Sequence, residues 1–231
     1  MKILVFSDLH GNLDCLKKLI KTKDFKTADK KIFLGDVAFG CSRPNKCINL
    51  LRKHNVINIA GNNDLYISSH IPIADASSFD SSKFAQMQYM EKNISQKNKN
   101  FINTWPKQLN ITLANKNLYF CHYAWETIDE EESVVDTPQT PNPNFCINSF
   151  KNINADYIFF GHEHKEYSFS INEKHYFCLD TIGLKNPGSY FVLYDNNGKI
   201  NINRKSLEHN LIKEKKLMYK AKYPFDKNKI Q

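Results

Sequence analysis

The sequence lacks a long hydrophobic run. Within its 231 residues, no apolar stretch approaches the roughly 18 residues that a membrane-spanning helix needs. The apolar run Ile3–Phe6 follows directly after Met1 and Lys2, is too short for a signal-peptide core, and precedes no small-residue cleavage site. These absences predict a cytoplasmic protein with no membrane partner.

Cysteine pairs at metal-binding spacing are also absent. The cysteines form no CxxC pair and no zinc-knuckle spacing. We therefore predict free thiols, several of them buried as small hydrophobic side chains. No serine or cysteine nucleophile signature is present either. The six cysteines are Cys15, Cys41, Cys47, Cys121, Cys146 and Cys178.

Net positive charge is nearly absent from the body of the chain and is concentrated at its end. Residues 199–231 contain ten Lys or Arg and three Asp or Glu, a net charge of +7. Residues 1–198 contain 22 Lys or Arg and 21 Asp or Glu, a net charge of +1, so the total is +8. A basic segment can bind nucleic acid or form a solvated helix face. We favour the solvated face, so that a nucleic-acid partner remains possible but is not favoured.

The apolar pattern predicts one α/β domain. The composition, 41% hydrophobic and 24% charged, is that of a globular protein. Buried strands at 2–7, 32–34 and 56–60 alternate with helical patterns after Asn12 and Pro44, which is typical of a parallel sheet with right-handed crossovers.

The second half of the chain predicts a mixture of hairpins and helices. We expect a helical stretch at 83–104, broken near 95–100, and a closing helix that Ser206 caps. Loops are expected at 68–82 and over the acidic stretch 124–145. Further expected elements are hairpins at 110–122, 167–179 and 190–202, a short helix at 145–150 and a buried strand at 157–160.

Several of the predicted strands end in residue types that bind metals. A single histidine or aspartate after a strand is usually structural, but the carboxyl ends of parallel strands share one edge of a sheet. Four or five such ends in one small domain therefore predict a shared site. The residues are Asp8, His10, Asp36, Asn62, His122, His162 and His164. We expect the other histidines to be non-ligands: His54, His70, His175 and His209.

The motifs that contain these residues resemble those of the calcineurin-like metallophosphoesterases. In order, they are Asp8-x-His10, Gly35-Asp36, Gly61-Asn62-x-Asp64, a histidine after a strand (His122), and Gly161-His162-x-His164. The resemblance covers about residues 1–205. It implies an α/β fold in which two mixed β-sheets form a sandwich flanked by helices. Residues 206–231 would then be a basic C-terminal helix or tail packed on, or extending from, the same domain.

The resemblance also implies a binuclear metal centre. One ion would be bound by Asp8, His10, Asp36 and His164, and the other by Asp36, Asn62, His122 and His162. Imidazole, carboxylate and amide ligands without thiolates suit manganese, with iron, zinc, nickel or cobalt possible. Two ions about 3.5–4 Å apart can share and activate a water that attacks phosphorus. The implied activity is hydrolysis of small phosphodiesters or phosphomonoesters, with diesters slightly preferred.

One position departs from the family pattern. The residue after the ligand Asn62 is often a histidine that can protonate the leaving group, but here it is Asn63. An amide cannot act as a general acid, a role worth about 10²–10⁴-fold in rate. We therefore expect the enzyme to prefer esters with good leaving groups, or to use a metal-bound water as the proton donor. Alternatively, Asn63 only holds Asp36 or the substrate by hydrogen bonds. We assign Asp36, Asn63 and Asp64 to the catalytic group.

Other residues are candidates for substrate contact. Asn62, Asn63 and Arg43 are predicted to bind substrate, Arg43 through its planar guanidinium. Tyr123 and Trp125 could wall the pocket or pack in the core. The turn signal at 186–189 is interpreted as structural. If the acidic residues 126–136 lie over the site, they would repel long polyanions.

Two alternatives remain open. The same site could serve a nuclease or a phosphoprotein phosphatase. The protein could also be a non-catalytic metal-binding scaffold, although the intact ligand types at all seven positions argue against it. The sequence leaves the oligomeric state open.

Overall fold

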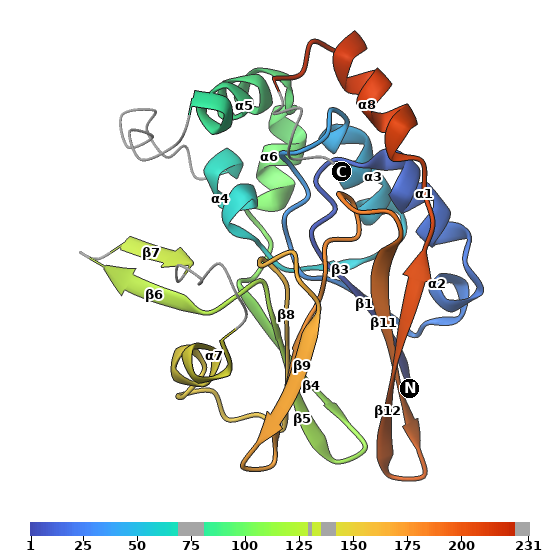
Figure 1. Cartoon of the computed structure of the whole chain (residues 1–231), viewed down its shortest axis with the longest axis vertical. Helices are drawn as coiled ribbons and strands as arrows, with labels where there is room; N and C mark the ends of the chain where they lie inside the picture. Colours follow the sequence, from blue (N-terminus) through green and yellow to red (C-terminus); the bar gives the residue numbers. More distant parts are fainter. Residues whose placement is uncertain (69–80, 129–130, 135–141, 225–231) are drawn as a thin grey trace.

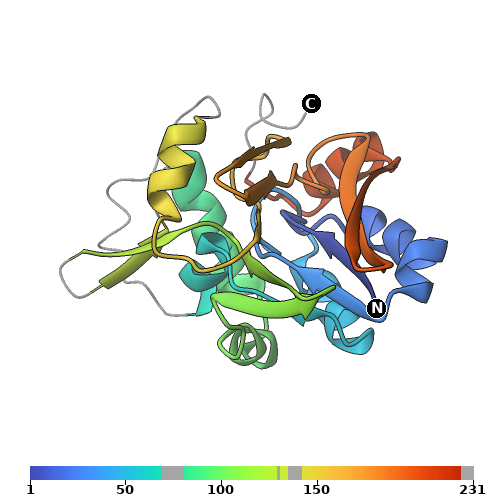
Figure 2. The same cartoon turned by 90° about the horizontal axis from the view of Figure 1, so that it is seen from below.

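Two mixed five-stranded sheets form the centre of the fold (Figure 1). The structure, a computed structural model, describes residues 1–68, 81–128, 131–134 and 142–224, with the backbone alone for 126–128 and 131–134. The two sheets lie side by side when seen from below in Figure 2, and helices flank them. This arrangement confirms the predicted α/β sandwich. Residues 69–80 of the expected loop, which include His70, and the side chains of the acidic stretch 126–136 lie outside the described residues. The ends of that expected loop are helical, since Ser68 lies in a helix and another helix begins at Ser81.

The first sheet has the strand order β12-β11-β1-β2-β3. The strands β1, β2 and β3 are parallel, as predicted, whereas β11 runs antiparallel to β1 and makes the sheet mixed. The bounds are β1 (Lys2–Phe6), β2 (Lys30–Phe33), β3 (Ile57–Asn58), β11 (Gly188–Asn196) and β12 (Lys199–Leu207).

The second sheet has the order β4-β5-β8-β10-β9. Its central strands β5, β8 and β10 are parallel, so their carboxyl ends lie at one edge. The bounds are β4 (Gln108–Leu113), β5 (Lys116–Cys121), β8 (Tyr157–Phe160), β9 (Tyr167–Ile171) and β10 (Lys174–Cys178). The hairpins predicted from the sequence are thereby confirmed.

A two-stranded ribbon corrects the predicted long loop at 124–145. Strands β6 (Trp125–Ile128) and β7 (Glu131–Val134) pair antiparallel there. Each short run contains residues of high strand propensity, such as Trp125 and Val134. The acidic residues between them have low strand propensity and obscured this signal.

Most of the helices cover the face of the first sheet that points away from the second sheet. Asn12 caps α1 as predicted, since its Oδ1 accepts a hydrogen bond from the Cys15 N–H at 3.0 Å. The predicted break in the 83–104 stretch is confirmed by separate helices α5 and α6. The bounds are α1 (Leu13–Lys21), α2 (Lys23–Thr27), α3 (Pro44–Lys53), α4 (Asn62–Ser68), α5 (Ser81–Asn93), α6 (Gln96–Ile102), α7 (Pro143–Ser149) and α8 (Leu211–Lys220).

The start of the closing helix was predicted wrongly. Ser206 lies in β12, where it pairs with Ser189 of β11, and Asn210 caps α8 by accepting from the Lys213 N–H at 2.8 Å. The predicted division between residues 205 and 206 therefore falls within a strand. Pairing along the whole of β11 outweighed the local capping tendency of one serine.

The core follows from alternation along the strands. In β1, Ile3 and Val5 pack in the cluster between the two sheets, whereas Leu4 and Phe6 pack under the helices.

All six cysteines are buried and unpaired, which confirms the free thiols. Among the described residues, no helix is long and apolar enough to cross a membrane.

Candidate metal centre

The predicted ligand residues follow the ends of strands in both sheets. Asp8 and His10 follow β1, and Asp36 follows β2. In the second sheet His122 follows β5, and the pair His162 and His164 follows β8. Asn62 is the first residue of α4, just after β3. The sandwich brings these ends together at one site.

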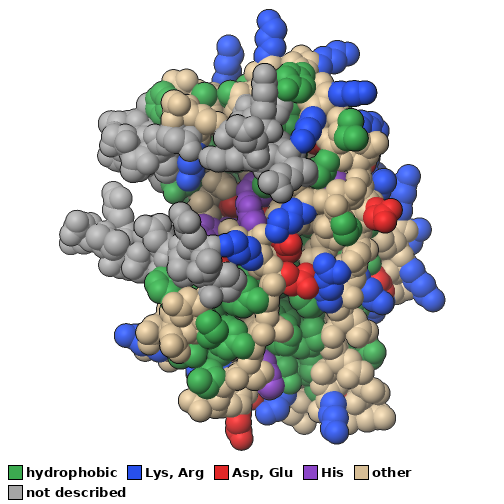
Figure 3. Space-filling model, viewed as in Figure 1, with side chains coloured by type: hydrophobic (Ala, Val, Ile, Leu, Met, Phe, Trp, Pro, Cys, Tyr) green, Lys and Arg blue, Asp and Glu red, His purple; other side chains and the backbone are tan. Residues whose placement is uncertain are grey.

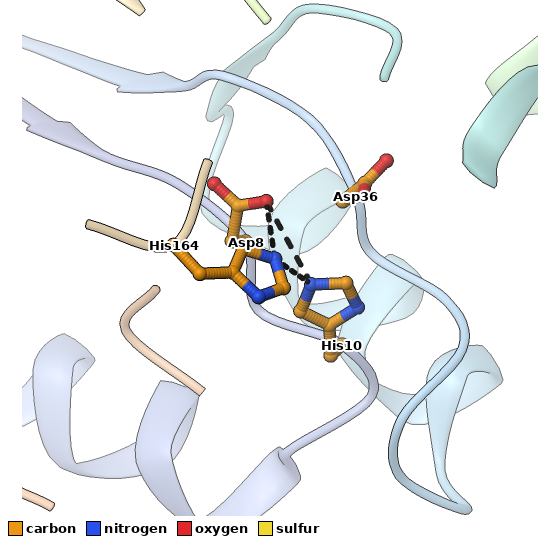
Figure 4. A group of neighbouring side chains, drawn as sticks. All are labelled: Asp8, His10, Asp36 and His164. Carbon is orange, nitrogen blue, oxygen red and sulfur yellow. Dashed lines mark hydrogen bonds and ion pairs between the residues drawn. The ribbon is translucent and has the colours of Figure 1, made fainter. Parts of the chain in front are cut away.

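One group of side chains forms a compact cluster. The ligand atoms of Asp8, His10, Asp36 and His164 all lie within 4.8 Å of one another (Figure 4). The Nε2 atoms of His10 and His164 are 2.8 Å apart, and Asp8 Oδ1 lies 3.1 Å from His164 Nε2. Asp8, His10 and Asp36 are buried, and His164 is half-buried.

A second group adjoins the first. Asn62 Oδ1 lies 3.1 Å from His122 Nε2 and 3.1 Å from His162 Nδ1, and these two ring nitrogens are 3.2 Å apart. Asp36 Oδ1 is 3.5 Å from His122 Nε2. Asp36 therefore lies within reach of both groups.

Two of the imidazole rings are oriented by backbone carbonyls. His10 Nδ1 lies 3.2 Å from the Ala38 oxygen, and His122 Nδ1 lies 3.0 Å from the Leu34 oxygen. A carbonyl can only accept, so each Nδ1 carries the proton and donates it. The Nε2 atom of each ring is left with a lone pair directed at the cluster, which is how metal-binding histidines are commonly prepared.

The backbone at the ligands is strained. Five of them have positive φ: Asp8 56°, His10 50°, Asp36 63°, His162 70° and His164 52°. Each such residue costs roughly 1–2 kcal/mol relative to the right-handed region. Strain of this kind persists where the surrounding structure enforces it and is concentrated at functional sites.

The electrostatics of the cluster favour a cation. Burial, together with the charge of Asp8 and against the influence of His10, raises the pKa of Asp36 to about 7. For Asp8, burial opposes ionisation, but His10 and His164 outweigh it and hold its pKa well below the usual range. Burial and the neighbouring His122 lower the pKa of His162 to about 3, which keeps its ring neutral.

The donor set fits divalent metal ions. Neighbouring ligand atoms lie 2.8–3.5 Å apart, as expected for atoms that share an ion at about 2.0–2.2 Å. The Nε2 atoms of His10 and His164 lie 2.8 Å apart, close enough for both to bind one ion. Neutral imidazoles, carboxylates and an amide oxygen are borderline ligands that suit first-row metals.

Asp64, which was predicted to belong to the catalytic group, accepts hydrogen bonds from three backbone N–H groups. Its Oδ2 accepts from the N–H groups of Asp36 at 2.8 Å and Gly61 at 2.9 Å, and its Oδ1 accepts from Val37 at 2.9 Å. The side chain is fully buried. Asp64 thus ties the segments that bear Asp36 and Asn62 together.

Asn63 contacts Asp36 through two donors. Its backbone N–H donates to Asp36 Oδ1 at 3.0 Å, and its side-chain Nδ2 donates to Asp36 Oδ2. This geometry favours the second of the two predicted roles, in which Asn63 holds the shared carboxylate. Gly61 allows the close approach, because a Cβ there would lie 2.7 Å from the Asp36 nitrogen.

The remaining substrate candidates have other partners. The Arg43 guanidinium pairs with the buried carboxylate of Glu214 in α8, with Nε to Oε1 at 3.3 Å. Tyr123 is fully buried and packs against Phe150 and Phe160, as in the core alternative. The Trp125 ring lies under the Lys107 ammonium at 4.8 Å.

Two contacts at the cluster had no signal in the sequence. Lys185 Nζ donates to the backbone oxygen of His164 at 2.6 Å, and Thr181 Oγ1 donates to that of Asp8 at 2.7 Å. Both residues come from the segment between β10 and β11, which leads into the predicted turn at 186–189. In Figure 3 histidine side chains lie in a hollow near the centre of the face, with Lys or Arg side chains beside it.

Comparisons with known proteins agree with this geometry. The calcineurin-like phosphoesterase superfamily domain matches residues 1–199. The uncharacterized protein MJ0912 of Methanocaldococcus jannaschii is 27% identical over 202 residues, which cover 81% of this chain and 75% of that protein.

Two solved structures share the fold. The metallophosphoesterase from Sphaerobacter thermophilus has a TM-score of 0.75 at 16% identity and covers 97% of this chain and 95% of its own. The hypothetical protein PH1004 from Pyrococcus horikoshii has a TM-score of 0.77 at 14% identity, with 96% and 94% covered. With a family match over most of its length and the family's motifs gathered at one site, the chain belongs to the calcineurin-like phosphoesterase superfamily.

Proposed function

We propose that this protein is a phosphoesterase that uses two divalent metal ions to hydrolyse small phosphodiesters or phosphomonoesters. The observation that supports it best is the sharing of Asp36 by two adjoining groups of ligand atoms. Asp8, His10 and His164 complete one group, and the other contains Asn62, His122 and His162.

The two ions, manganese by preference, would lower the pKa of a shared water and stabilise negative charge at phosphorus. The protein's part is to place and orient the ligands. Backbone carbonyls turn His10 and His122 toward the site, while Asn63 holds both oxygens of Asp36. No serine or cysteine nucleophile is required.

Asn63 sets the expected substrate preference. Its amide donates to Asp36 and cannot supply a proton to a departing alkoxide. Esters whose leaving group needs no proton should therefore react faster, and aryl phosphodiesters should be preferred to alkyl ones. Equal rates on aryl and alkyl esters of the same charge would contradict this part of the proposal.

The experiment is a substrate panel with the purified protein in Mn²⁺, Co²⁺ or Ni²⁺. It compares bis(para-nitrophenyl) phosphate, para-nitrophenyl phosphate, a phosphopeptide and a single-stranded oligonucleotide. The last two substrates test the phosphatase and nuclease alternatives. We expect turnover of the aryl esters, and the loss of most of it in Asp36→Asn.

Asp156→Asn is the matched control. Asp156 precedes β8, at the opposite end of the strand from the site, and pairs with Lys116 at 3.0 Å. The control should retain wild-type rates. Absence of turnover with every metal would favour the scaffold alternative, and activity that survives Asp36→Asn would refute the two-metal site.

A further inference from the structure

The chain continues beyond the residues that match the family domain, and its end returns to the metal centre. The match stops at residue 199. The C-terminal segment, here residues 208–224, contains α8 and packs near α1 and α3 (Figure 1). It contacts residues 37–43, here called the metal loop, which connect Asp36 to α3.

The metal loop sets the orientation of His10. The Ala38 carbonyl accepts from His10 Nδ1 at 3.2 Å, and the Val37 carbonyl accepts from the Gly11 N–H at 2.7 Å. Gly40 lies against the imidazole so closely that a Cβ there would approach His10 Cβ to 2.9 Å. A shift of the loop would therefore turn or displace the His10 ring.

The loop does not maintain this shape by itself. Phe39 and Gly40 have positive φ of 63° and 85°. A non-glycine residue such as Phe39 adopts that conformation at a cost and needs external contacts to hold it there. The C-terminal segment supplies one such contact directly, at Arg43, and one through Gln86.

Glu214 of α8 anchors one end of the metal loop. Its carboxylate is fully buried and contacts both Nε and Nη2 of Arg43. A buried carboxylate without its partner is costly, so the pair holds the loop and α8 together tightly. The predicted phosphate contact by Arg43 would require this pair to open.

Tyr223 anchors the middle of the loop through Gln86 of α5. The Tyr223 hydroxyl donates to Gln86 Oε1 at 2.8 Å, and the Gly40 N–H donates to the same oxygen at 3.3 Å. Tyr223 is only 4% exposed, and its ring packs edge-on against Tyr89 at 5.0 Å. The hydroxyl thus fixes the acceptor that the loop uses.

His209 makes a third connection. Its Nε2 donates to the Lys185 carbonyl at 2.7 Å, and its Nδ1 accepts from Asn12 Nδ2 at 3.3 Å. Asn12 lies two residues after His10. The ammonium of Lys185 donates to the carbonyl of His164. The C-terminal segment is therefore connected to Asn12 near His10 directly, and to His164 through Lys185.

From these contacts we infer that the C-terminal segment positions His10 for metal binding, with Glu214 and Tyr223 as positioning residues. The inference rests on the proposed metal centre. It assigns a role in the site to residues outside the family domain, and it assigns Arg43 to this brace rather than to the substrate.

The test uses the full-length variants Tyr223→Phe and Glu214→Gln. Tyr157→Phe and Glu173→Gln are matched controls at the opposite end of the second sheet. Metal affinity is measured by titration with Co²⁺, whose visible absorption also reports the ligand geometry. Loss of contacts that orient a metal-binding histidine typically weakens affinity about 10–100-fold. We expect about tenfold for Tyr223→Phe and a changed Co²⁺ spectrum, with neither change in the controls.

A double variant separates positioning from general stability. In His10→Gln the ring is already lost, so adding Tyr223→Phe should weaken Co²⁺ binding no further. Hydrogen exchange of the metal-free protein should be faster over residues 37–43 in Tyr223→Phe. If Glu214→Gln does not fold, the tyrosine variant still decides the question.

Unchanged affinity and spectrum in Tyr223→Phe would overturn the inference, as would an equal loss with and without His10. These measurements do not depend on hydrolysis. If the wild type binds Co²⁺ but cleaves no ester, the proposed function fails while the positioning role is still tested.

Discussion

Asp64→Asn should destabilise the protein strongly although it changes a single atom. The carboxylate accepts three buried backbone N–H groups, two on Oδ2 and one on Oδ1. An asparagine whose oxygen replaces Oδ2 keeps the bonds from Asp36 and Gly61. Its NH₂ group then faces the Val37 N–H, donor against donor.

The magnitude follows from that loss. A hydrogen bond to a charged acceptor contributes about 1.5–3 kcal/mol, and a buried N–H left without an acceptor costs about 1–3 kcal/mol. We expect the free energy of unfolding to fall by about 2–4 kcal/mol. For a protein of this size that corresponds to a decrease in Tm of about 5–15 °C.

The assay is urea and thermal unfolding of the metal-free protein. Burial and the charge of Asp36 raise the pKa of Asp64 to about 7, so ionisation of the wild-type carboxylate costs some stability above that pH and offsets part of the loss. The comparison is made near pH 8, about one unit higher, where the wild-type carboxylate is mostly ionised and can accept all three hydrogen bonds. Asp156→Asn, whose carboxylate accepts from the Asn117 N–H at the surface, should lose less than half as much. A loss below about 0.5 kcal/mol in Asp64→Asn, within the range of ordinary surface substitutions, would refute the assigned role.

Other predictions concern metal, packing and thiols. Mn²⁺ at a hundred times its Kd should stabilise the wild type by about 2.7 kcal/mol, measured as a rise in Tm, and chelation should reverse it. Gly61→Ala should abolish this rise, since its Cβ would meet the Asp36 backbone nitrogen at 2.7 Å, whereas Gly198→Ala in an open turn should retain it. Phe33→Ala should cost about 3–5 kcal/mol in urea unfolding, because the ring is fully buried against Phe6. A thiol reagent should label the buried cysteines only upon unfolding; rapid labelling of the native protein would contradict their burial.

The strand ends were predictable because local pattern and topology act together. A short apolar run such as Ile3–Phe6 specifies a buried strand, and parallel pairing puts its end beside those of β2 and β3. The residues that follow, such as Asp8 and Asp36, must then converge. The convergence of these strand ends could therefore be predicted from the sequence and the resemblance.

The roles of the supporting residues could not be read in the same way. Asp64 could be placed in the catalytic group from its motif, but the backbone amides that it binds are set by how two loops meet. Arg43 and Glu214 are 171 residues apart, and nothing local pairs them. Such contacts depend on tertiary packing, which periodicity does not encode.

The ribbon β6–β7 and the end of β12 show the same limit on another scale. Ser206 is a good cap by composition, yet its strand continues because β11 offers a partner along its whole length. Local propensity is a weak guide where long-range pairing competes with it. The element types were mostly predicted, and their ends were not.

The most direct test of the account is the anomalous scattering of a crystal grown with Mn²⁺. We predict two peaks about 3.5–4 Å apart, both in contact with Asp36. One should also contact Asp8, His10 and His164, and the other Asn62, His122 and His162. A single peak, or ions that do not share Asp36, would contradict the binuclear site on which the proposed function depends.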